Sequence, residues 1–208
     1  HTGTARLYTD VGLLTCNPEI CQDVADLFNY LTGHSDFRDY RKLLVAPVNM
    51  RRRFIEMIRR EARLHTPENP GHIFAKMNQL EDTEIIEALY EASSAGVQID
   101  LLVRGFCCLK PGVPGMSENI RVRTLIGRFL EHSRIYHFRN GGNDEYYIGS
   151  ADWMSRNLDW RVELITPIEA PALQKELRYI LRTCWADHSQ SWELQSDGRY
   201  VRRRPRRG

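Results

Sequence analysis

His132 and Arg134 are the residues whose types and spacing point most directly to chemistry, and they lie in the stretch FLEHSRIYHFRNGG, residues 129–142. An imidazole titrates near neutral pH and its nitrogen can carry a phosphoryl group, while a guanidinium binds phosphate oxygens. Side chains two residues apart in a strand point to the same side. The spacing therefore predicts one phosphate-handling site, although a histidine at an element boundary is more often a packing or capping residue.

Further polar residues that suit a phosphate surround this pair in the sequence. The turn GSAD at 149–152 offers a hydroxyl and backbone N–H groups. Fixed cations and amides stabilise the charge on a transferring phosphoryl group. Either Glu163 or Asp152 is expected to orient the His132 ring. The candidate pocket-lining residues are Arg134, Ser150, Asp152, Arg156, Lys76 and Asn78.

A sheet with helices is expected to position these residues, because residues 42–105 alternate between strand and helix patterns. That alternation is typical of an α/β layer with a largely parallel core. Ligands of such sheets bind at the C-terminal ends of strands. Arg104 and the segment Lys76–Asn78 are predicted to lie at such ends. The predicted strands are 42–47, 71–79 and 97–105, and the helices are 49–64 and 83–96, with Asp82 as cap and Gly96 as stop.

The flanking segments complete a predicted α/β fold with a central mixed β-sheet and helices on both faces. Asn17 and Pro18 are a helix cap and a first helical residue, so a helix is predicted over 17–31. The other expected helices are 126–133, a short one, and 171–185. The other expected strands are 5–15, 120–125, two around Gly141–Gly142, and 159–168.

Composition favours a soluble globular protein of the cytoplasm. The chain has 208 residues, 42% apolar and 27% charged, and no apolar run approaches the ~20 residues of a membrane helix. Its five cysteines form no CxxC pair and no zinc spacing, which fits a reducing compartment. The net charge of +2 does not indicate nucleic-acid binding, and the basic tail is predicted to be disordered. The first residue is not methionine, so we expect part of a longer protein.

The order of these polar residues resembles the signature of the phospholipase D superfamily. The matching positions are His132, Arg134, Gly149–Ser150, Asp152, Asn157 and Glu163. In that superfamily one histidine from each of two homologous halves attacks and protonates a phosphoester. This chain carries one such histidine motif, with arginine in place of lysine, without the usual aspartate four residues later, and with a longer hairpin before the glycine and serine. These departures count against ordinary phosphodiesterase activity.

Longer strings are similar to the C-terminal region of bacterial polyphosphate kinase, the type built on phospholipase-D-like domains. They are TARLYTDVGLLT, ASSAGVQIDLLVRGFCCLKPG, SENIRV, FLEHSRIYHFRNGG and YYIGSADWMSRNLDWRVE, and they extend from Thr4 to about Tyr200. The resemblance implies one C-terminal phospholipase-D-like catalytic domain over 1–208, with a strand arm at 1–16 that continues from an upstream domain, and a basic tail at 201–208.

The activity implied by the resemblance is reversible transfer of the ATP terminal phosphate to inorganic polyphosphate through a phosphohistidine in the upstream domain. Tyr8, Arg104 and His132 match the family's ATP-phosphate contacts, and His132 is also the catalytic candidate, as general acid or charged clamp. Mg²⁺ is implied for the whole enzyme, with ligands largely upstream and none in this chain.

The implied partners are ATP, ADP, inorganic polyphosphate and the upstream domains of the same chain. The whole enzyme is expected to be a homo-oligomer in the cytoplasm, associated peripherally with the membrane, and the isolated chain is expected to be inactive. Neither a nucleic-acid partner nor a transmembrane segment is expected. Two alternatives stay open: a phospholipase-D-like phosphodiesterase or nuclease completed by dimerisation, and a non-catalytic polyanion-binding module that uses the arginine clusters.

Overall fold

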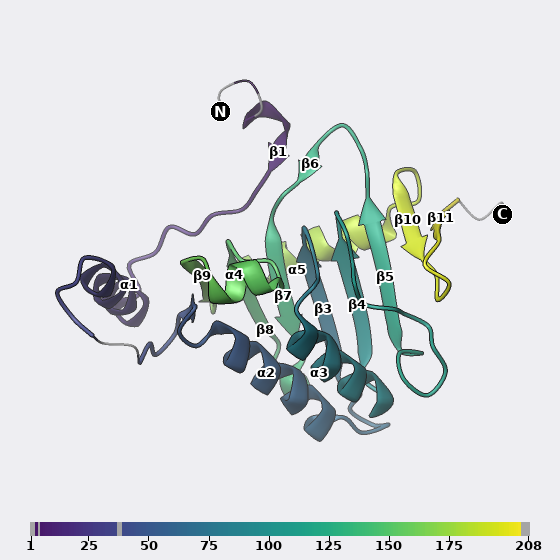
Figure 1. Cartoon of the computed structure of the whole chain (residues 1–208), viewed down its shortest axis with the longest axis horizontal. Coiled ribbons are helices and arrows are strands. Elements are labelled where there is room, and N and C mark those ends of the chain that lie inside the picture. The colour runs from purple at the N-terminus through teal and green to yellow at the C-terminus, as the bar shows by residue number, and fades with distance from the viewer. Residues whose placement is uncertain (1–2, 4, 37–38, 205–208) are drawn as a thin grey trace.

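The computed structural model describes residues 3, 5–36 and 39–204, and its centre is a twisted mixed β-sheet (Figure 1). Within these residues nine strands form this sheet in the order β11-β10-β5-β4-β3-β7-β8-β9-β2. Only β3, β4 and β5 are mutually parallel, and all other neighbours pair antiparallel. The strands are β2 (Leu44–Ala46), β3 (His72–Met77), β4 (Gln98–Val103), β5 (Ile120–Leu125), β7 (Arg134–Phe138), β8 (Glu145–Gly149), β9 (Glu163–Ile168), β10 (Ser191–Leu194) and β11 (Tyr200–Arg202).

The predicted mixed sheet is confirmed, but the expectation of a largely parallel core for residues 42–105 is correct only in part. β2 lies at the far edge and pairs antiparallel with β9 instead of lying beside β3. The alternation of strands and helices gives their order along the chain. It does not give their order in the sheet, which depends on pairing with later strands.

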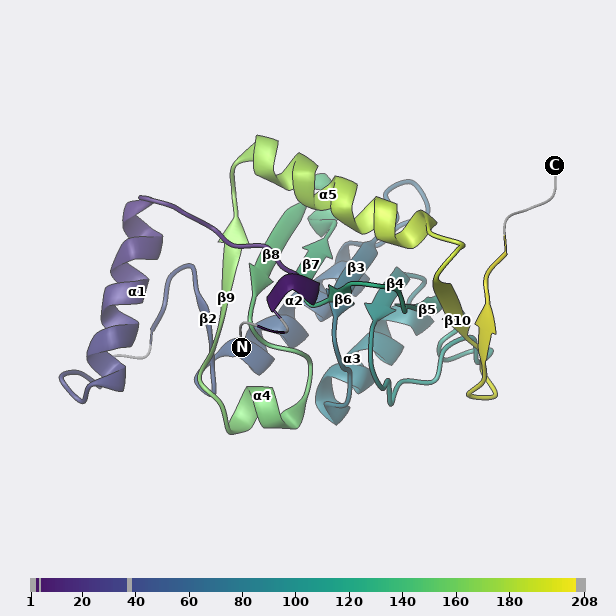
Figure 2. The same cartoon turned by 90° about the horizontal axis from the view of Figure 1, so that it is seen from above.

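Helices cover both faces of the sheet, as predicted (Figure 2). α2 (Met50–Leu64) and α3 (Thr83–Ser94) pack on one face, and α5 (Pro171–Ala186) crosses the other. Successive β3 residues follow this division, because Ile73 and Ala75 belong to the core with α2 and α3, and Phe74 to the core with α5. No helix in the described part of the chain is long and apolar enough to cross a bilayer.

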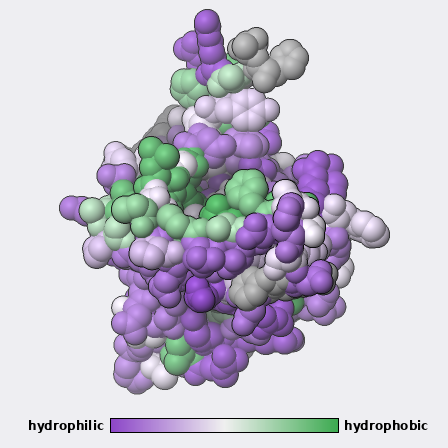
Figure 3. All heavy atoms as spheres, turned by 90° about the vertical axis from the view of Figure 1, so that its left-hand side faces the viewer, coloured by the Kyte–Doolittle hydropathy of each residue, from purple (hydrophilic) through white to green (hydrophobic). Residues whose placement is uncertain are grey.

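The helix α1 (Pro18–Leu31) lies at the β2 edge, where long connections join it to the sheet (Figure 1). The Asn17 side chain accepts hydrogen bonds from the backbone of Glu19 and Ile20, so the predicted cap is confirmed. Ile20 and Leu27 pack with Val45 in a small core of their own. This end of the molecule is largely hydrophilic with an apolar patch (Figure 3), and the large exposed apolar side chains that α1 contributes are Phe28 and Leu31.

Two predicted elements near the site are wrong. Residues 5–15 form a 3₁₀ turn and the two-residue strand β1 (Tyr8–Thr9) instead of one strand. Residues 126–133 form no helix, and β6 (Leu130–Glu131) pairs there in parallel with β1. Eight residues make too few turns to be a stable helix without burial, and Phe129 is 52% exposed.

The basic C-terminus is more ordered than predicted. Tyr200–Arg202 form β11 on β10, and the Arg203 amide donates to the Ser191 carbonyl at 3.0 Å. The Arg203 guanidinium donates to the carbonyls of Trp185 and Asp187. Residues 205–208 lie outside the described part of the chain. The short helix α4 (Ser155–Asp159) was also not predicted.

One buried histidine is expected to make the stability of the fold depend on pH. Burial lowers the pKa of His137 to about 4, although its Nε2 contacts Asp144 Oδ1 at 2.8 Å. The unfolded chain takes up this proton near pH 6.5, so it binds more protons than the folded chain between pH 6.5 and 4. The free energy of unfolding should therefore fall in this window as the pH drops, by at most about 3 kcal/mol from this group.

Urea unfolding at pH 7 and pH 5 measures this effect. In His137→Gln, the difference between the free energies of unfolding at pH 7 and pH 5 should be much smaller, whatever the overall stability of the variant. His34→Gln, at an exposed histidine, should keep it. Equal pH dependence in His137→Gln and the unsubstituted chain would show that this ring is not the source.

Candidate functional site

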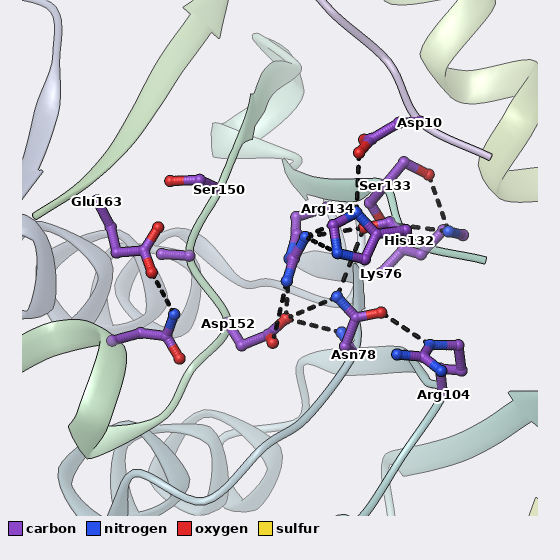
Figure 4. A network of polar contacts seen from close by, with 12 residues as sticks. Asp10, Lys76, Asn78, Arg104, His132, Ser133, Arg134, Ser150, Asp152 and Glu163 are labelled. Carbon is purple, nitrogen blue, oxygen red and sulfur yellow. Dashed lines mark hydrogen bonds and ion pairs between the residues drawn. The ribbon is translucent and has the colours of Figure 1, made fainter. Parts of the chain in front are cut away.

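The candidate site lies at the edge of the sheet where β3 and β4 end and β7 begins (Figure 4). Asn78 follows β3, Arg104 follows β4, and His132 precedes β7. Arg104 Nε donates to Asn78 Oδ1 at 2.9 Å. This contact confirms that the two strand ends bring Arg104 and Asn78 together, as the sequence predicted.

The His132 ring is held by a carboxylate, a guanidinium and an aromatic ring. Its Nδ1 is 2.8 Å from Asp10 Oδ2, and Arg134 Nη1 is 3.1 Å from its Nε2. The Tyr8 ring meets it edge-on with centroids 4.9 Å apart. Arg134 Nη1 is also 3.2 Å from Nδ1, and an atom that is equally far from both ring nitrogens cannot lie along the in-plane lone pair of either, so the guanidinium lies against the face of the imidazole. His132 and Arg134 therefore do face one site.

The pairing of β1 with β6 places Tyr8 and Asp10 beside His132. Thr9 is the central residue, because its carbonyl accepts from the amides of both His132 and Ser133 at 3.1 Å. Its hydroxyl donates to the Leu130 carbonyl at 3.3 Å. The N-terminal segment thus contributes to the site through backbone contacts with a segment more than 120 residues later in the chain.

Asp152 connects the Arg134 and Asn78 parts of the site. It is 5% exposed, and its Oδ1 accepts from the Asn78 backbone amide at 2.8 Å and from Arg134 Nε at 3.1 Å. Arg134 Nη2 donates to the other carboxylate oxygen at 3.3 Å. The result is a continuous chain of contacts from Arg104 to His132, which fixes the guanidinium of Arg134 against the ring.

Lys76 lies beneath the residues that flank His132. Its ammonium is buried, donates to Ser133 Oγ at 2.8 Å and to the Ser133 carbonyl at 3.1 Å, and lies 3.3 Å from Glu131 Oε2. Burial lowers the pKa of Lys76, and the nearby Glu131 carboxylate opposes that shift. Lys76 therefore supports the His132 loop from inside the protein.

Three other candidate residues lie outside this chain of contacts. The Ser150 hydroxyl accepts from the Leu164 amide at 3.1 Å, and Figure 4 shows Ser150 apart from Arg134 and Asn78. Arg156 is exposed on α4. Glu163 accepts from Asn157 Nδ2 at 2.5 Å. Within the described residues, Asp10 is the carboxylate in contact with the His132 ring, where Glu163 or Asp152 had been expected.

The polar residues of the site do not form a metal centre. No group of three or more His, Cys, Asp or Glu residues in the described part of the chain is arranged to hold a metal ion. Asp10 is bonded to the imidazole, and Asp152 to Arg134 and the Asn78 amide. The carboxylates of the site are thus engaged with nitrogen donors, and the arrangement suits an anion better than a cation.

Sequence reasoning missed Asp10, Thr9 and Ser133. Asp10 could have been suspected because it lies two residues after Tyr8, which was already a candidate. Thr9 and Ser133 act through backbone and buried contacts that depend on which segments pair, and residue type alone does not reveal such a role.

Comparison with known proteins gives the family. The model of "Polyphosphate kinase C-terminal domain 2" matches residues 43–208, and that of "Polyphosphate kinase C-terminal domain 1" matches residues 1–37. The polyphosphate kinase of Synechocystis sp. is 63% identical over 97% of this chain, and that of Pseudomonas aeruginosa is 52% identical over 99%. The chain covers 28% and 30% of these two relatives.

Comparison with solved structures gives the same family. The crystal structure of polyphosphate kinase from Porphyromonas gingivalis superposes with a TM-score of 0.93 at 41% identity, covering 99% of this chain and 32% of that one. Nuc from Salmonella typhimurium, a phospholipase D family member, has a TM-score of 0.51 at 15% identity and covers 74% of this chain and 98% of its own, which shows a shared fold. The chain belongs to the polyphosphate kinase family and corresponds to its C-terminal part.

Proposed function

We propose that this chain binds the phosphates of ATP in an enzyme that reversibly transfers the terminal phosphate of ATP to inorganic polyphosphate. The observation that carries the proposal is the set of contacts around His132, in a chain 63% identical to a polyphosphate kinase. The phosphorylated histidine of the reaction is proposed to lie upstream of this chain. ATP, ADP and polyphosphate are the proposed substrates.

The geometry supports distinct roles for three residues. Arg104 donates a hydrogen bond from its Nε to Asn78, so its two terminal nitrogens are proposed to bind phosphate oxygens. The Tyr8 hydroxyl is proposed to donate to the same anion, since this residue is 45% exposed. The Arg134 guanidinium lies against the His132 ring, with Nη1 3.2 Å from Nδ1 and 3.1 Å from Nε2, so a phosphate anion that contacts one of these two groups is proposed to contact the other as well. Nε2 is proposed to act as a clamp or an acid once it has taken up a proton.

The remaining candidates differ in how the structure supports them. Arg134, Asp152, Lys76 and Asn78 are proposed to position the site through the contacts above. Ser150 and Arg156 are kept as lining residues for a substrate that extends beyond His132. The carboxylates of the site, Asp10 and Asp152, are engaged by nitrogen donors, so the ligands of Mg²⁺ are proposed to lie in the upstream domains.

The wider setting is proposed on the same basis. Residues 1–208 are proposed to be one C-terminal phospholipase-D-like catalytic domain, in which 1–16 are an arm that continues from an upstream domain and 201–208 are a basic tail. The whole enzyme is proposed to act as a homo-oligomer in the cytoplasm with peripheral membrane association. The five thiols, all free in the structure, fit a reducing compartment.

Two measurements with γ-labelled ATP test the proposed function. The 208-residue chain alone should form no stable phosphohistidine. In the full-length kinase, Arg104→Gln should weaken ATP binding about 10- to 100-fold, because a lost hydrogen bond to a charged group is worth about 1.5–3 kcal/mol.

Arg63→Gln, which changes an exposed arginine on α2, is the matched control and should leave ATP affinity unchanged. An unchanged affinity in Arg104→Gln would contradict the assigned role. Metal-independent cleavage of a phosphodiester by the chain would instead support the nuclease alternative. Tight polyphosphate binding that neither Arg104→Ala nor His132→Ala alters would support the polyanion-binding alternative.

A further inference from the structure

A second cluster of cationic and imidazole groups lies at the opposite end of the strands from His132. A cavity of about 150 Å³ is bounded there by the start of β3, the end of β7 and one side of α5. His137 lies in β7 and His132 precedes this strand by two residues, so the five residues between them span at most roughly 17 Å at about 3.4 Å per residue. The residues that line the cavity and carry the argument are His72, His137, Arg139, Asp144, Arg178 and Arg182.

The acidic groups of this cluster are already occupied by partners within the protein. Asp144 contacts His137 Nε2 at 2.8 Å and also pairs with Arg178. Asp100, behind His72, contacts His72 Nε2 at 3.1 Å and accepts two hydrogen bonds from Arg121. The inner layer is therefore a set of satisfied hydrogen bonds and Asp–Arg ion pairs, and these carboxylates do not neutralise the other arginines.

Two arginines at the cavity have no such partners. Arg139 Nε is buried and has no hydrogen-bond partner within the described residues. Arg182 is exposed on α5, and neither Arg139 nor Arg182 forms an ion pair with the described part of the chain. A buried guanidinium N–H without an acceptor costs free energy, so an anion in this cavity would be stabilised.

Charge and size define the ligand. Three arginines and one aspartate line the cavity, and the pKa of His137 is lowered by burial, so this ring stays neutral at pH 7 and the lining is cationic. The cavity is smaller than the roughly 300–1,000 Å³ of pockets for drug-sized ligands, so a single phosphate group matches its size better than a nucleoside does.

We propose that Arg139, Arg178 and Arg182, with the imidazoles of His72 and His137, form a second anion site that binds a phosphate group away from the His132 site. The site is separate from the one assigned to ATP and does not depend on that assignment. The phosphate can be inorganic phosphate or one unit of a polyphosphate chain, and the experiment separates these two sources.

The test is a titration of the 208-residue chain with inorganic phosphate and, separately, with tripolyphosphate, followed by the imidazole NMR signals of His137 and His132. The His137 signals should shift in a saturable way. If both ligands saturate the shift, a single phosphate is sufficient for binding. If only tripolyphosphate does so, the ligand is one unit of a polyphosphate chain. Arg139→Gln/Arg182→Gln should weaken the His137 response at least tenfold.

Two controls keep the outcome specific. Arg128→Gln, an exposed arginine near the other end of the strands, should leave the His137 response intact. Arg104→Gln should alter the His132 response only, so failure of one site is distinguishable from failure of the other. Arg182→Gln alone changes only an exposed residue. It tests the same site if the double variant does not fold. The proposal is wrong if neither ligand shifts His137, or if the arginine substitutions do not change the shift.

Discussion

His132→Ala is expected to slow phosphoryl transfer between ATP and polyphosphate by about 10²–10⁴-fold in the full-length kinase, the range that a positioned acid–base group contributes. The ring is oriented by Asp10 on Nδ1 and by the Arg134 guanidinium, which is close to both ring nitrogens, so alanine removes the group on which both contacts converge. The measurement is the initial rate in both directions with saturating ATP or ADP, together with the dissociation constant of ATP.

The matched control is His34→Ala, which removes an exposed histidine bonded to Thr32 and should leave the rate unchanged. Asp10→Asn should slow transfer less than His132→Ala, because the imidazole stays in place and loses only the carboxylate that orients it through Nδ1. A normal rate in His132→Ala would exclude a catalytic role. A stable phosphohistidine at His132 in the isolated chain would make it the nucleophile and contradict the proposed upstream residue.

Local signals in the sequence were sufficient to locate much of the site. The Asp82 side chain accepts from the Ile85 amide at 3.0 Å, as predicted for a cap, and Gly96 closes α3 with φ +98°. With the helices limited in this way, the apolar runs between them had to be strands. The rule that ligand groups gather at strand ends then placed Asn78 beside Arg104 correctly.

Contacts between segments that are distant in the sequence could not be predicted from such local signals. Asp10 reaches His132 because β1 pairs with β6, and two-residue strands have no detectable alternation. The same pairing explains why the helix predicted for 126–133 is wrong. Lys76 is predicted from the sequence as a pocket-lining residue, but its ammonium is turned inward to Ser133, a contact that residue type and spacing do not determine.

Asp152→Ala is expected to destabilise the fold by about 3–5 kcal/mol, the cost of removing one partner of a buried ion pair. Asp152 accepts from Arg134 with both oxygens and from the Asn78 amide, and its side chain is 7% exposed. Alanine leaves the Arg134 guanidinium, 12% exposed, without its carboxylate. Urea unfolding of the 208-residue chain measures the change in the free energy of unfolding. The midpoint temperature of thermal unfolding, Tm, should fall by about 2–4 °C for each kcal/mol lost.

The double variant Arg134→Met/Asp152→Ala separates the ion pair from other effects of the substitution. It removes both charges, so it should be destabilised by less than the sum of Arg134→Met and Asp152→Ala. Asp197→Ala, which removes an exposed partner of Arg199, is the control and should change stability little. Additive effects of Arg134→Met and Asp152→Ala would mean that the pair is not coupled. His132 would then depend on Asp10 and the β1–β6 pairing alone for its orientation, because Asp152 would no longer fix Arg134 against the ring.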